Sequence, residues 1–161
     1  MENPHATSLP LLDEVKLQAR VLVPVVRALR ERIGKEAADE LVGAALRQWS
    51  RDVHRRIGEE KADGARERWD AVWADLRPRI GTETVESERL RDDASAREFN
   101  VTRCAYAEFF KALGEPELGR FLVCDLDFDI AAVGAPDVEL ARTQTIMQGA
   151  PYCDFRYRFR R

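Results

Sequence analysis

Residues 152–160 read YCDFRYRFR and alternate apolar with polar side chains almost without a break. Successive side chains of an extended chain point to opposite faces, so this stretch predicts a strand with one buried face. That face would carry Cys153, Phe155, Tyr157 and Phe159. The opposite, solvated face would carry Asp154, Arg156, Arg158 and Arg160. Residues 138–148 are also rich in β-forming residues, and the Gly-Ala-Pro sequence at 149–151 predicts a turn between the two strands. We therefore expect an antiparallel hairpin here.

The early part of the chain predicts helices instead. Within residues 12–33, apolar residues recur three or four positions apart, which places them along one side of a helix. Pro24 interrupts this pattern and should kink or split the helix, because proline lacks a backbone donor. Gly34 is expected to end it.

Two further helices are expected before residue 81. The apolar side of the second runs through residues 38–57, and the helix should end near Gly58; the third covers about 65–80. Trp49, Trp69 and Trp73 lie at helical spacing on these apolar stripes, which predicts that they belong to the core.

Residues 81–95 are polar and acidic, show no periodicity and predict a connection. It would join a helical part, residues 1–80, to an α+β part, residues 96–161. Because the helices have apolar stripes but no other layer to cover them, both parts should form one domain, residues 1–161. The expected fold is α+β, with N-terminal helices packed on a C-terminal antiparallel sheet.

Helices should also intervene between the strands of this second part. Residues 98–102 alternate as a short strand, and residues 103–113 predict a helix that ends at Gly114. Pro116 can open another helix in its first turn. Residues 117–129 are apolar enough to be buried and fit either a helix or a strand.

Composition limits the class of protein. Among 161 residues, 45% are apolar and 34% are charged, which is typical of a soluble globular domain. A net charge of −3 argues against nucleic acid as a partner, because phosphate binding needs an excess of basic residues. The N-terminal residues show no signal-peptide pattern, and no apolar stretch approaches the length of a membrane span. With an odd number of widely spaced cysteines, we expect a cytoplasmic protein without disulfides.

The three cysteines, Cys104, Cys124 and Cys153, all lie in the last third of the chain and allow three interpretations. They can be small core residues, or the thiolate ligands of a metal with a nearby carboxylate, or can include a lone nucleophile that needs a base. The candidate carboxylates are Glu108, Asp125, Asp127 and Asp154. Glu108 lies four residues after Cys104, so the two would project from one face of a helix. His54 is interpreted as a surface residue, far from the cysteines.

Other polar residues suggest a binding site less strongly. Arg142, Gln144 and Gln148 belong to a predicted strand with more polar side chains than a half-buried strand needs, so some should face a polar cavity. Arg142 can bind a ligand carboxylate or form an ion pair with Glu139 or an aspartate. Asp125, Asp127 and Asp129 alternate with apolar residues and predict a solvated face.

Three segments of the last third resemble the L-2-amino-thiazoline-4-carboxylic acid hydrolase family: REFNVTRCAYAEFFKALGEPELG (97–119), FLVCDLDF (121–128) and DVELARTQTIMQGAPYCDFRYR (137–158). The resemblance implies hydrolytic opening of a five-membered cyclic isothiourea acid to a carbamoyl-cysteine, on a bacterial route to L-cysteine. The Gly149–Cys153 spacing is also similar to that of vinyl-reductase-type sensor domains, some of which hold zinc through cysteines and a glutamate. Those sensors have a further cysteine where this chain has Thr145.

The resemblance leads to a mechanistic hypothesis. The substrate carbon, bonded to two nitrogens and one sulfur, resembles the carbon that zinc deaminases attack with metal-bound hydroxide. We therefore expect a zinc-type metal at Cys104, Cys124 and Cys153, with Glu108 as general acid and base and with Cys104 and Cys153 at the reaction centre. The expected substrate-binding residues are Arg142, Gln144, Gln148 and Tyr106.

Two alternatives remain open at this point. A cysteine can attack the same carbon without a metal, or the domain can bind a small molecule as a sensor without turning it over. In each case the expected partner is a small molecule, with neither nucleic acid nor membrane involved and no organic cofactor. The N-terminal helices can additionally form a homodimer.

Overall fold

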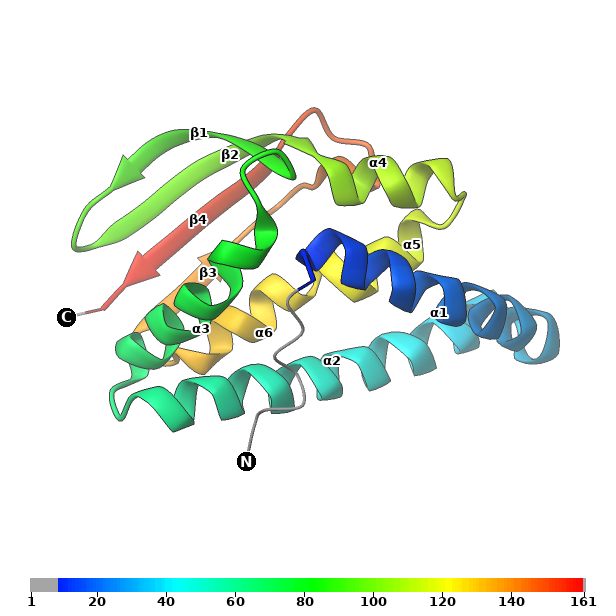
Figure 1. Cartoon of the computed structure of the whole chain (residues 1–161), viewed down its shortest axis with the longest axis horizontal. Helices are drawn as coiled ribbons and strands as arrows, with labels where there is room; N and C mark the ends of the chain where they lie inside the picture. Colours follow the sequence, from blue (N-terminus) through cyan, green and yellow to red (C-terminus); the bar gives the residue numbers. More distant parts are fainter. Residues whose placement is uncertain (1–8, 161) are drawn as a thin grey trace.

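The computed structural model describes residues 9–160 and shows an α+β fold (Figure 1). Its first elements are the helices α1 (Leu11–Ile33), α2 (Lys35–Lys61) and α3 (Ala65–Ile80). They are followed by strands β1 (Val85–Asp92) and β2 (Ala96–Cys104), and by helices α4 (Ala105–Ala112), α5 (Pro116–Gly119), η1 (Arg120–Cys124) and α6 (Leu126–Val133). The chain ends with β3 (Val138–Ala141), the short helix η2 (Ile146–Gln148) and β4 (Cys153–Phe159). The predicted fold class is thereby confirmed.

Helix α1 runs without a break through Pro24, so the proline does not split it. Its buried side chains are Val15, Ala19, Val23 and Val26, at the spacing expected for one side of a helix. Gly34 ends the helix as predicted, with a positive φ of 87°.

Helix α2 packs through a different side than the one predicted. Leu41 and Trp49, expected in the core, are 56% and 42% exposed. The buried side consists of small or polar residues, which allow neighbouring helices to approach the backbone of α2. A Cβ at Gly58 would lie only 2.7 Å from Cγ1 of Val133 in α6. His54 lies on this side and is 6% exposed, so its interpretation as a surface residue was wrong.

The sheet is antiparallel throughout, in the order β1-β2-β4-β3. The predicted terminal hairpin is confirmed, but β3 ends at Ala141 rather than near Gln148. Beyond it, the backbone N–H groups of Thr143 and Gln144 donate to Oδ1 of Asp154, at 2.9 and 2.8 Å, instead of pairing with a strand. The prediction of a connection at residues 81–95 was wrong for the part that forms β1. This edge strand has no buried face, so its sequence shows no apolar alternation.

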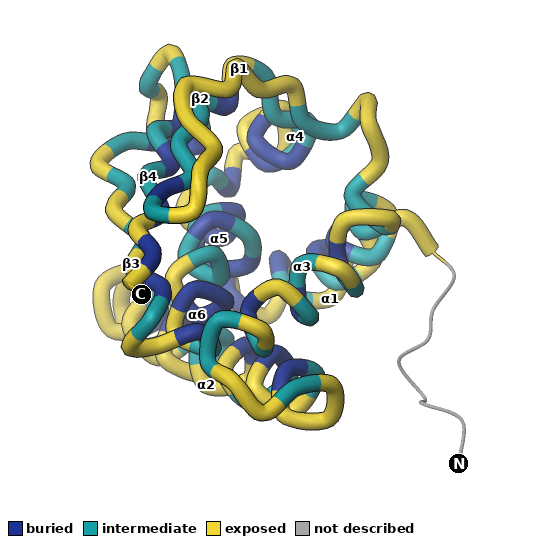
Figure 2. Tube along the Cα trace, turned by 90° about the vertical axis from the view of Figure 1, so that its left-hand side faces the viewer, coloured by how far each residue is buried: buried dark blue, intermediate teal, exposed yellow. Residues whose placement is uncertain are grey.

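The inner face of the sheet forms the core with α3 and α6 (Figure 2). As predicted, Cys153, Phe155, Tyr157 and Phe159 all lie on this face. Phe99 of β2 stacks on Phe155 of β4 with ring centroids 4.8 Å apart. Trp69 of α3 is 1% exposed and packs against Tyr157 at 5.1 Å. The burial pattern of β4 therefore follows directly from its sequence.

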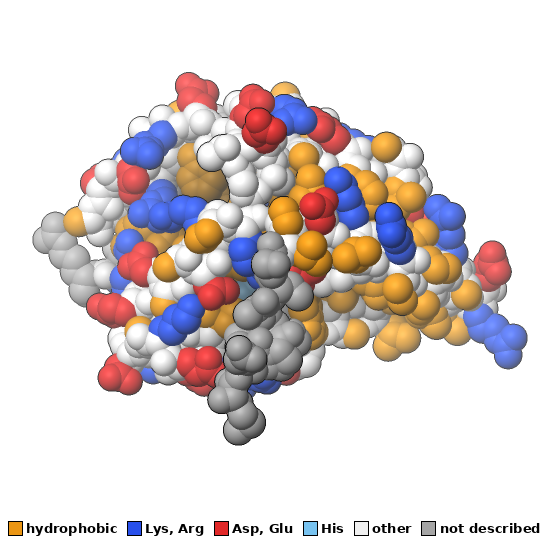
Figure 3. All heavy atoms as spheres, viewed as in Figure 1, with side chains coloured by type: hydrophobic (Ala, Val, Ile, Leu, Met, Phe, Trp, Pro, Cys, Tyr) orange, Lys and Arg blue, Asp and Glu red, His pale blue; other side chains and the backbone are white. Residues whose placement is uncertain are grey.

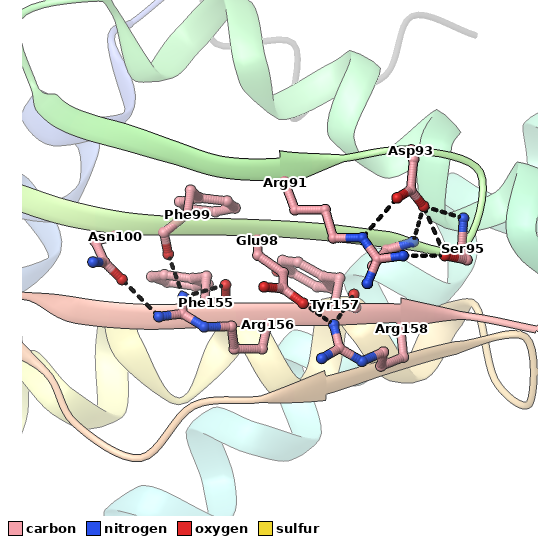
Figure 4. A network of polar contacts seen from close by, with 11 residues as sticks. Arg91, Asp93, Ser95, Glu98, Phe99, Asn100, Phe155, Arg156, Tyr157 and Arg158 are labelled. Carbon is pink, nitrogen blue, oxygen red and sulfur yellow. Dashed lines mark hydrogen bonds and ion pairs between the residues drawn. The ribbon is translucent and has the colours of Figure 1, made fainter.

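The outer face of the sheet is polar (Figure 4). Arg156 donates to the backbone oxygen of Phe99 at 2.9 Å and to Oδ1 of Asn100 at 2.8 Å. Arg158 pairs with Glu98 in the neighbouring strand. Both arginines therefore lie on the solvated face of β4, as predicted, and their guanidinium groups contact residues of the neighbouring strand.

Residues 117–129 are helical, which settles the open choice between helix and strand. The π-helical turn η1 is closed by a bond of 2.8 Å from the backbone N–H of Asp125 to the oxygen of Arg120. The interpretation of the following aspartates as a solvated face was wrong. Asp129 is 4% exposed and accepts a hydrogen bond of 2.8 Å from Arg51, and Asp127 forms an ion pair inside the protein.

An apolar surface remains exposed on the N-terminal helices, where Figure 3 shows orange side chains gathered over α1 and α2. It includes Leu17, Val21, Val25 and Leu41. These are the side chains that the predicted homodimer would cover, and the dimer stays a prediction. Within residues 9–160, no helix combines the length and apolar composition that a membrane crossing requires.

Candidate functional site

A cavity of about 370 Å³ lies between the N-terminal helices and the inner face of the sheet. Its walls come from α1, α2 and α3 on one side and from β2, β4, α4, η1 and α6 on the other. Most of the lining is apolar. The polar part includes all three cysteines, together with His54, Arg79, Tyr106, Asp127 and Arg142. Ligand sites commonly have this size and this composition, with a few polar groups in an apolar wall.

The three cysteines reach the cavity from different elements. Cys153 is the first residue of β4 and pairs in register with Val101 of β2. Along β2 the pairing shifts after Val101, so that Thr102 is an extra residue and Cys104 faces the cavity as well. Cys124 ends η1. The sequence-predicted thiols thus line a single cavity, although they are 20 and 29 residues apart in sequence.

Burial raises the pKa of each thiol above its usual value. For Cys104, the backbone N–H groups of Ala107 and Tyr106 at the start of α4 oppose this effect without reversing it. For Cys153, the backbone N–H of Ile146 donates to Sγ at 3.2 Å and also acts against the shift. All three cysteines are therefore thiols rather than thiolates at neutral pH.

The donor set required for a metal is not assembled in this arrangement. Across residues 9–160, no three or more His, Cys, Asp or Glu side chains come together in a group that could hold a metal ion. The zinc site at Cys104, Cys124 and Cys153 stays a prediction.

Asp127 and Arg142 form the principal polar pair in the cavity wall. Nη1 of Arg142 lies 2.5 Å from Oδ2 of Asp127, and its Nη2 donates to the backbone oxygen of Cys124 at 2.8 Å. The Arg142 side chain is only 4% exposed, and its guanidinium lies 5.1 Å from the ring centroid of Phe155. Of the two interpretations of Arg142, the structure therefore shows the ion pair with an aspartate.

The position of Asp127 follows from the helix that carries it. Cys124 and Asp127 are three residues apart on a helical segment, so both face the same side. Burial raises the pKa of Asp127 to about 6, although the charge of Arg142 and its hydrogen bond oppose this shift. The result is a carboxyl group in a cavity wall that can take up and release a proton near neutral pH.

His54 is a second titratable group in the cavity wall, although its sequence context predicted a surface residue far from the cysteines. It reaches the cavity from α2, and its Nδ1 lies 3.1 Å from the hydroxyl of Ser50, one helical turn earlier. Burial lowers the pKa of His54, and the nearby charges of Asp129 and Asp75 only partly offset this effect. The imidazole is therefore neutral at pH 7.

A second arginine enters the cavity wall from α3. Arg79 pairs through Nη2 with Glu14 of α1, and both side chains line the cavity. Tyr106 of α4, a predicted substrate-binding residue, also lines it and is 5% exposed. Neither Arg79 nor Glu14 stood out in the sequence, because each lies within an ordinary amphipathic helix.

Three other predicted residues lie outside this cavity wall. Cys104 is in strand conformation, so Glu108 is not directed towards it; Glu108 is exposed and pairs with Arg103 at 2.9 Å. The side-chain amide of Gln144 donates to the backbone oxygen of Tyr152 at 3.0 Å. Gln148 accepts a hydrogen bond of 2.9 Å from Thr145. Their predicted roles in chemistry or binding gain no geometric support.

Comparison with protein families gives one match that covers nearly the whole chain. The family model described as L-2-amino-thiazoline-4-carboxylic acid hydrolase matches residues 14–157. The match extends over the helical half, which had no recognisable motif, and includes every residue named above as lining the cavity. A search of curated proteins gives no match.

Proposed function

The chain belongs to the L-2-amino-thiazoline-4-carboxylic acid hydrolase family, and we propose that it hydrolyses a small cyclic isothiourea acid such as L-2-amino-thiazoline-4-carboxylate. The observation that carries this proposal is the buried Asp127–Arg142 pair in the wall of a cavity large enough for one such molecule. The apolar walls would exclude bulk water around the ring, which strengthens every electrostatic interaction inside the site.

Asp127 is the proposed general base. Its carboxylate accepts a proton from a water molecule while the water oxygen bonds to the carbon that carries two nitrogens and one sulfur. The electron pair of the C=N bond moves to the ring nitrogen, which takes the proton from Asp127 and gives a neutral tetrahedral intermediate. Asp127 then removes the proton of the new hydroxyl group as the C=O bond forms, and passes it to the departing ring atom as the bond of that atom to this carbon breaks. The product, a carbamoyl-cysteine, contains the substrate plus one water.

Arg142 supports this role as a positioning residue. Its guanidinium fixes Oδ2 of Asp127 and anchors the pair to the backbone of η1 through Cys124. Among residues 9–160, Oδ1 of Asp127 accepts no hydrogen bond, so this oxygen is free for the water. The positive charge also keeps the carboxyl group largely ionised at pH 7, which a base requires.

Cys104 is the proposed nucleophile of an alternative route without a metal. Backbone N–H groups of Tyr106 and Ala107, at the start of α4, favour its thiolate and oppose the effect of burial. In that route the thiol would add to the same carbon and water would release the product. Cys104→Ser distinguishes the routes, because it abolishes turnover by thiol addition but leaves water addition in place.

The direct test of the function is product analysis. Purified protein is incubated with L-2-amino-thiazoline-4-carboxylate, and the product is examined by mass spectrometry against a control without protein. A mass gain of one water establishes ring opening, and fragmentation shows whether the C–N or the C–S bond was broken. If the substrate binds but is returned unchanged by folded protein, the proposed hydrolase activity is refuted.

A further inference from the structure

Three buried hydrogen-bond donors in the cavity wall have no partner among the described residues. They are Nε1 of Trp73, Nε of Arg79 and the hydroxyl of Tyr106. A buried donor without an acceptor costs about 1–3 kcal/mol, and native structures contain few of them. Other buried donors without a partner lie elsewhere in the described part of the chain, but these three face a cavity, where a ligand with hydrogen-bond acceptors would satisfy them.

Arg79 is the cavity arginine that remains open to a ligand. The guanidinium of Arg142 already donates to Asp127 and to the backbone of Cys124. Arg79 uses Nη2 for Glu14, and Glu14 is held in turn by Gln18, whose amide donates to it at 3.4 Å. This arrangement fixes the orientation of the guanidinium and leaves Nε buried, with no partner within the described residues 9–160.

Tyr106 supplies a second donor in the wall of the same cavity. Its hydroxyl is buried and has no partner among residues 9–160, and a phenol is protonated at neutral pH. A guanidinium edge and a hydroxyl together can donate to the two oxygens of a carboxylate.

We propose that Arg79 and Tyr106 form the subsite that binds the carboxylate of the substrate, with Glu14 as the positioning residue of Arg79. The identity of the substrate rests on the proposed function, whereas recognition of a small cyclic acid does not depend on turnover. Glu14, Asp75 and Asp127 also line the cavity, so a monoanion suits the site better than a phosphate dianion. Arg142, which the sequence predicted to bind this carboxylate, forms an ion pair with Asp127.

The experiment measures binding with a ligand that the protein cannot open. L-Thiazolidine-4-carboxylate retains the five-membered sulfur ring and the carboxylate but lacks the amidine carbon. Its affinity is compared by calorimetry with that of thiazolidine, which lacks the carboxylate. The proposal requires tighter binding of the acid, because only the acid satisfies Arg79 and Tyr106.

Variants assign this difference to the two residues. Arg79→Gln should weaken binding of the acid about tenfold or more, and Tyr106→Phe about three- to tenfold, without changing the affinity for thiazolidine. Arg77→Gln is the matched control, because Arg77 lies on the same helix but is exposed. Tyr106→Phe removes a hydroxyl that has no partner and should fold normally, so it carries the test if Arg79→Gln is unstable.

Equal affinity of Arg79→Gln or Tyr106→Phe and the wild type for the acid would overturn the subsite, as would equal binding of acid and thiazolidine. The outcomes for the two proposals are separable. Binding that depends on Arg79 without turnover of the aminothiazoline acid refutes the hydrolase but retains the subsite. Turnover with an unchanged KM in Arg79→Gln refutes the subsite but retains the hydrolase.

Discussion

The titration of Asp127 predicts how the proposed activity depends on pH. Burial raises its pKa to about 6. With that value, the ionised fraction of the carboxyl group falls from about nine tenths at pH 7 to about one tenth at pH 5. Because the base must be ionised to accept a proton, kcat/KM should fall about tenfold over this interval.

The assay is the initial rate of loss of L-2-amino-thiazoline-4-carboxylate between pH 5 and pH 8, at substrate concentrations well below KM. NMR titration of the substrate alone gives the pKa values that must be separated from those of the protein. An ordinary aspartate, with a pKa of about 3.9, would still be roughly nine tenths ionised at pH 5. A flat profile down to pH 5 would therefore refute the assignment of Asp127 as the base.

Four further predictions follow from particular contacts. Arg142→Gln removes a charge that lowers the pKa of Asp127, so the acid limb of kcat/KM should move to higher pH in that variant; an unmoved limb would mean that another group titrates. The folded-state pKa of His54 is lowered, so its contribution to stability is present above about pH 6.5 and lost as pH falls towards the folded-state value. Melting curves at pH 7 and pH 5 should show a larger loss for the wild type than for His54→Gln, and equal losses would contradict this. Gly58→Ala would bring a Cβ to 2.7 Å from Val133 and should lower the free energy of unfolding by about 1–3 kcal/mol. The exposed control Ala44→Ser should change it little. An unchanged denaturation midpoint for Gly58→Ala would show that α6 can move away without loss of stability. Dialysis against a chelator should leave kcat unchanged, because the proposed route uses Asp127; loss of activity that zinc restores would instead support the predicted metal at the cysteines.

The elements with a simple periodicity were predictable from the sequence. The alternation in β4 and the spacing in α1 each report a single buried side, and both elements lie where the sequence indicates. Strand β1 was not predictable in this way, because an exposed edge strand has no apolar face. The packing side of α2 was also missed. It is formed by Gly58 and other small residues, which allow neighbouring helices to approach the backbone of α2 closely. A pattern of apolar residues does not reveal such a side.

The candidate site was only partly predictable, for a related reason. The cysteines were identified by their rarity, and the structure brings them to one cavity. Asp127 was treated as solvated because it alternates with Leu126 and Phe128, which is the pattern of a strand. In a helix, the same residues place Asp127 on the same side as Cys124. The position of Asp127 could therefore not be predicted while residues 117–129 fitted either a helix or a strand. A bulge at Thr102 similarly decides the direction of Cys104, and no residue type signals it.

A comparison of four proteins decides whether Asp127 acts as the base on a cyclic isothiourea acid in this cavity. Turnover of L-2-amino-thiazoline-4-carboxylate is measured by mass spectrometry for the wild type, Asp127→Asn, Glu108→Gln and the surface control Glu139→Gln. We expect a product one water heavier, formed about 100-fold or more slowly by Asp127→Asn and at nearly the wild-type rate by the other two. Full activity in Asp127→Asn would show that Asp127 is not the base, and loss of activity in Glu108→Gln alone would assign the acid–base role to Glu108.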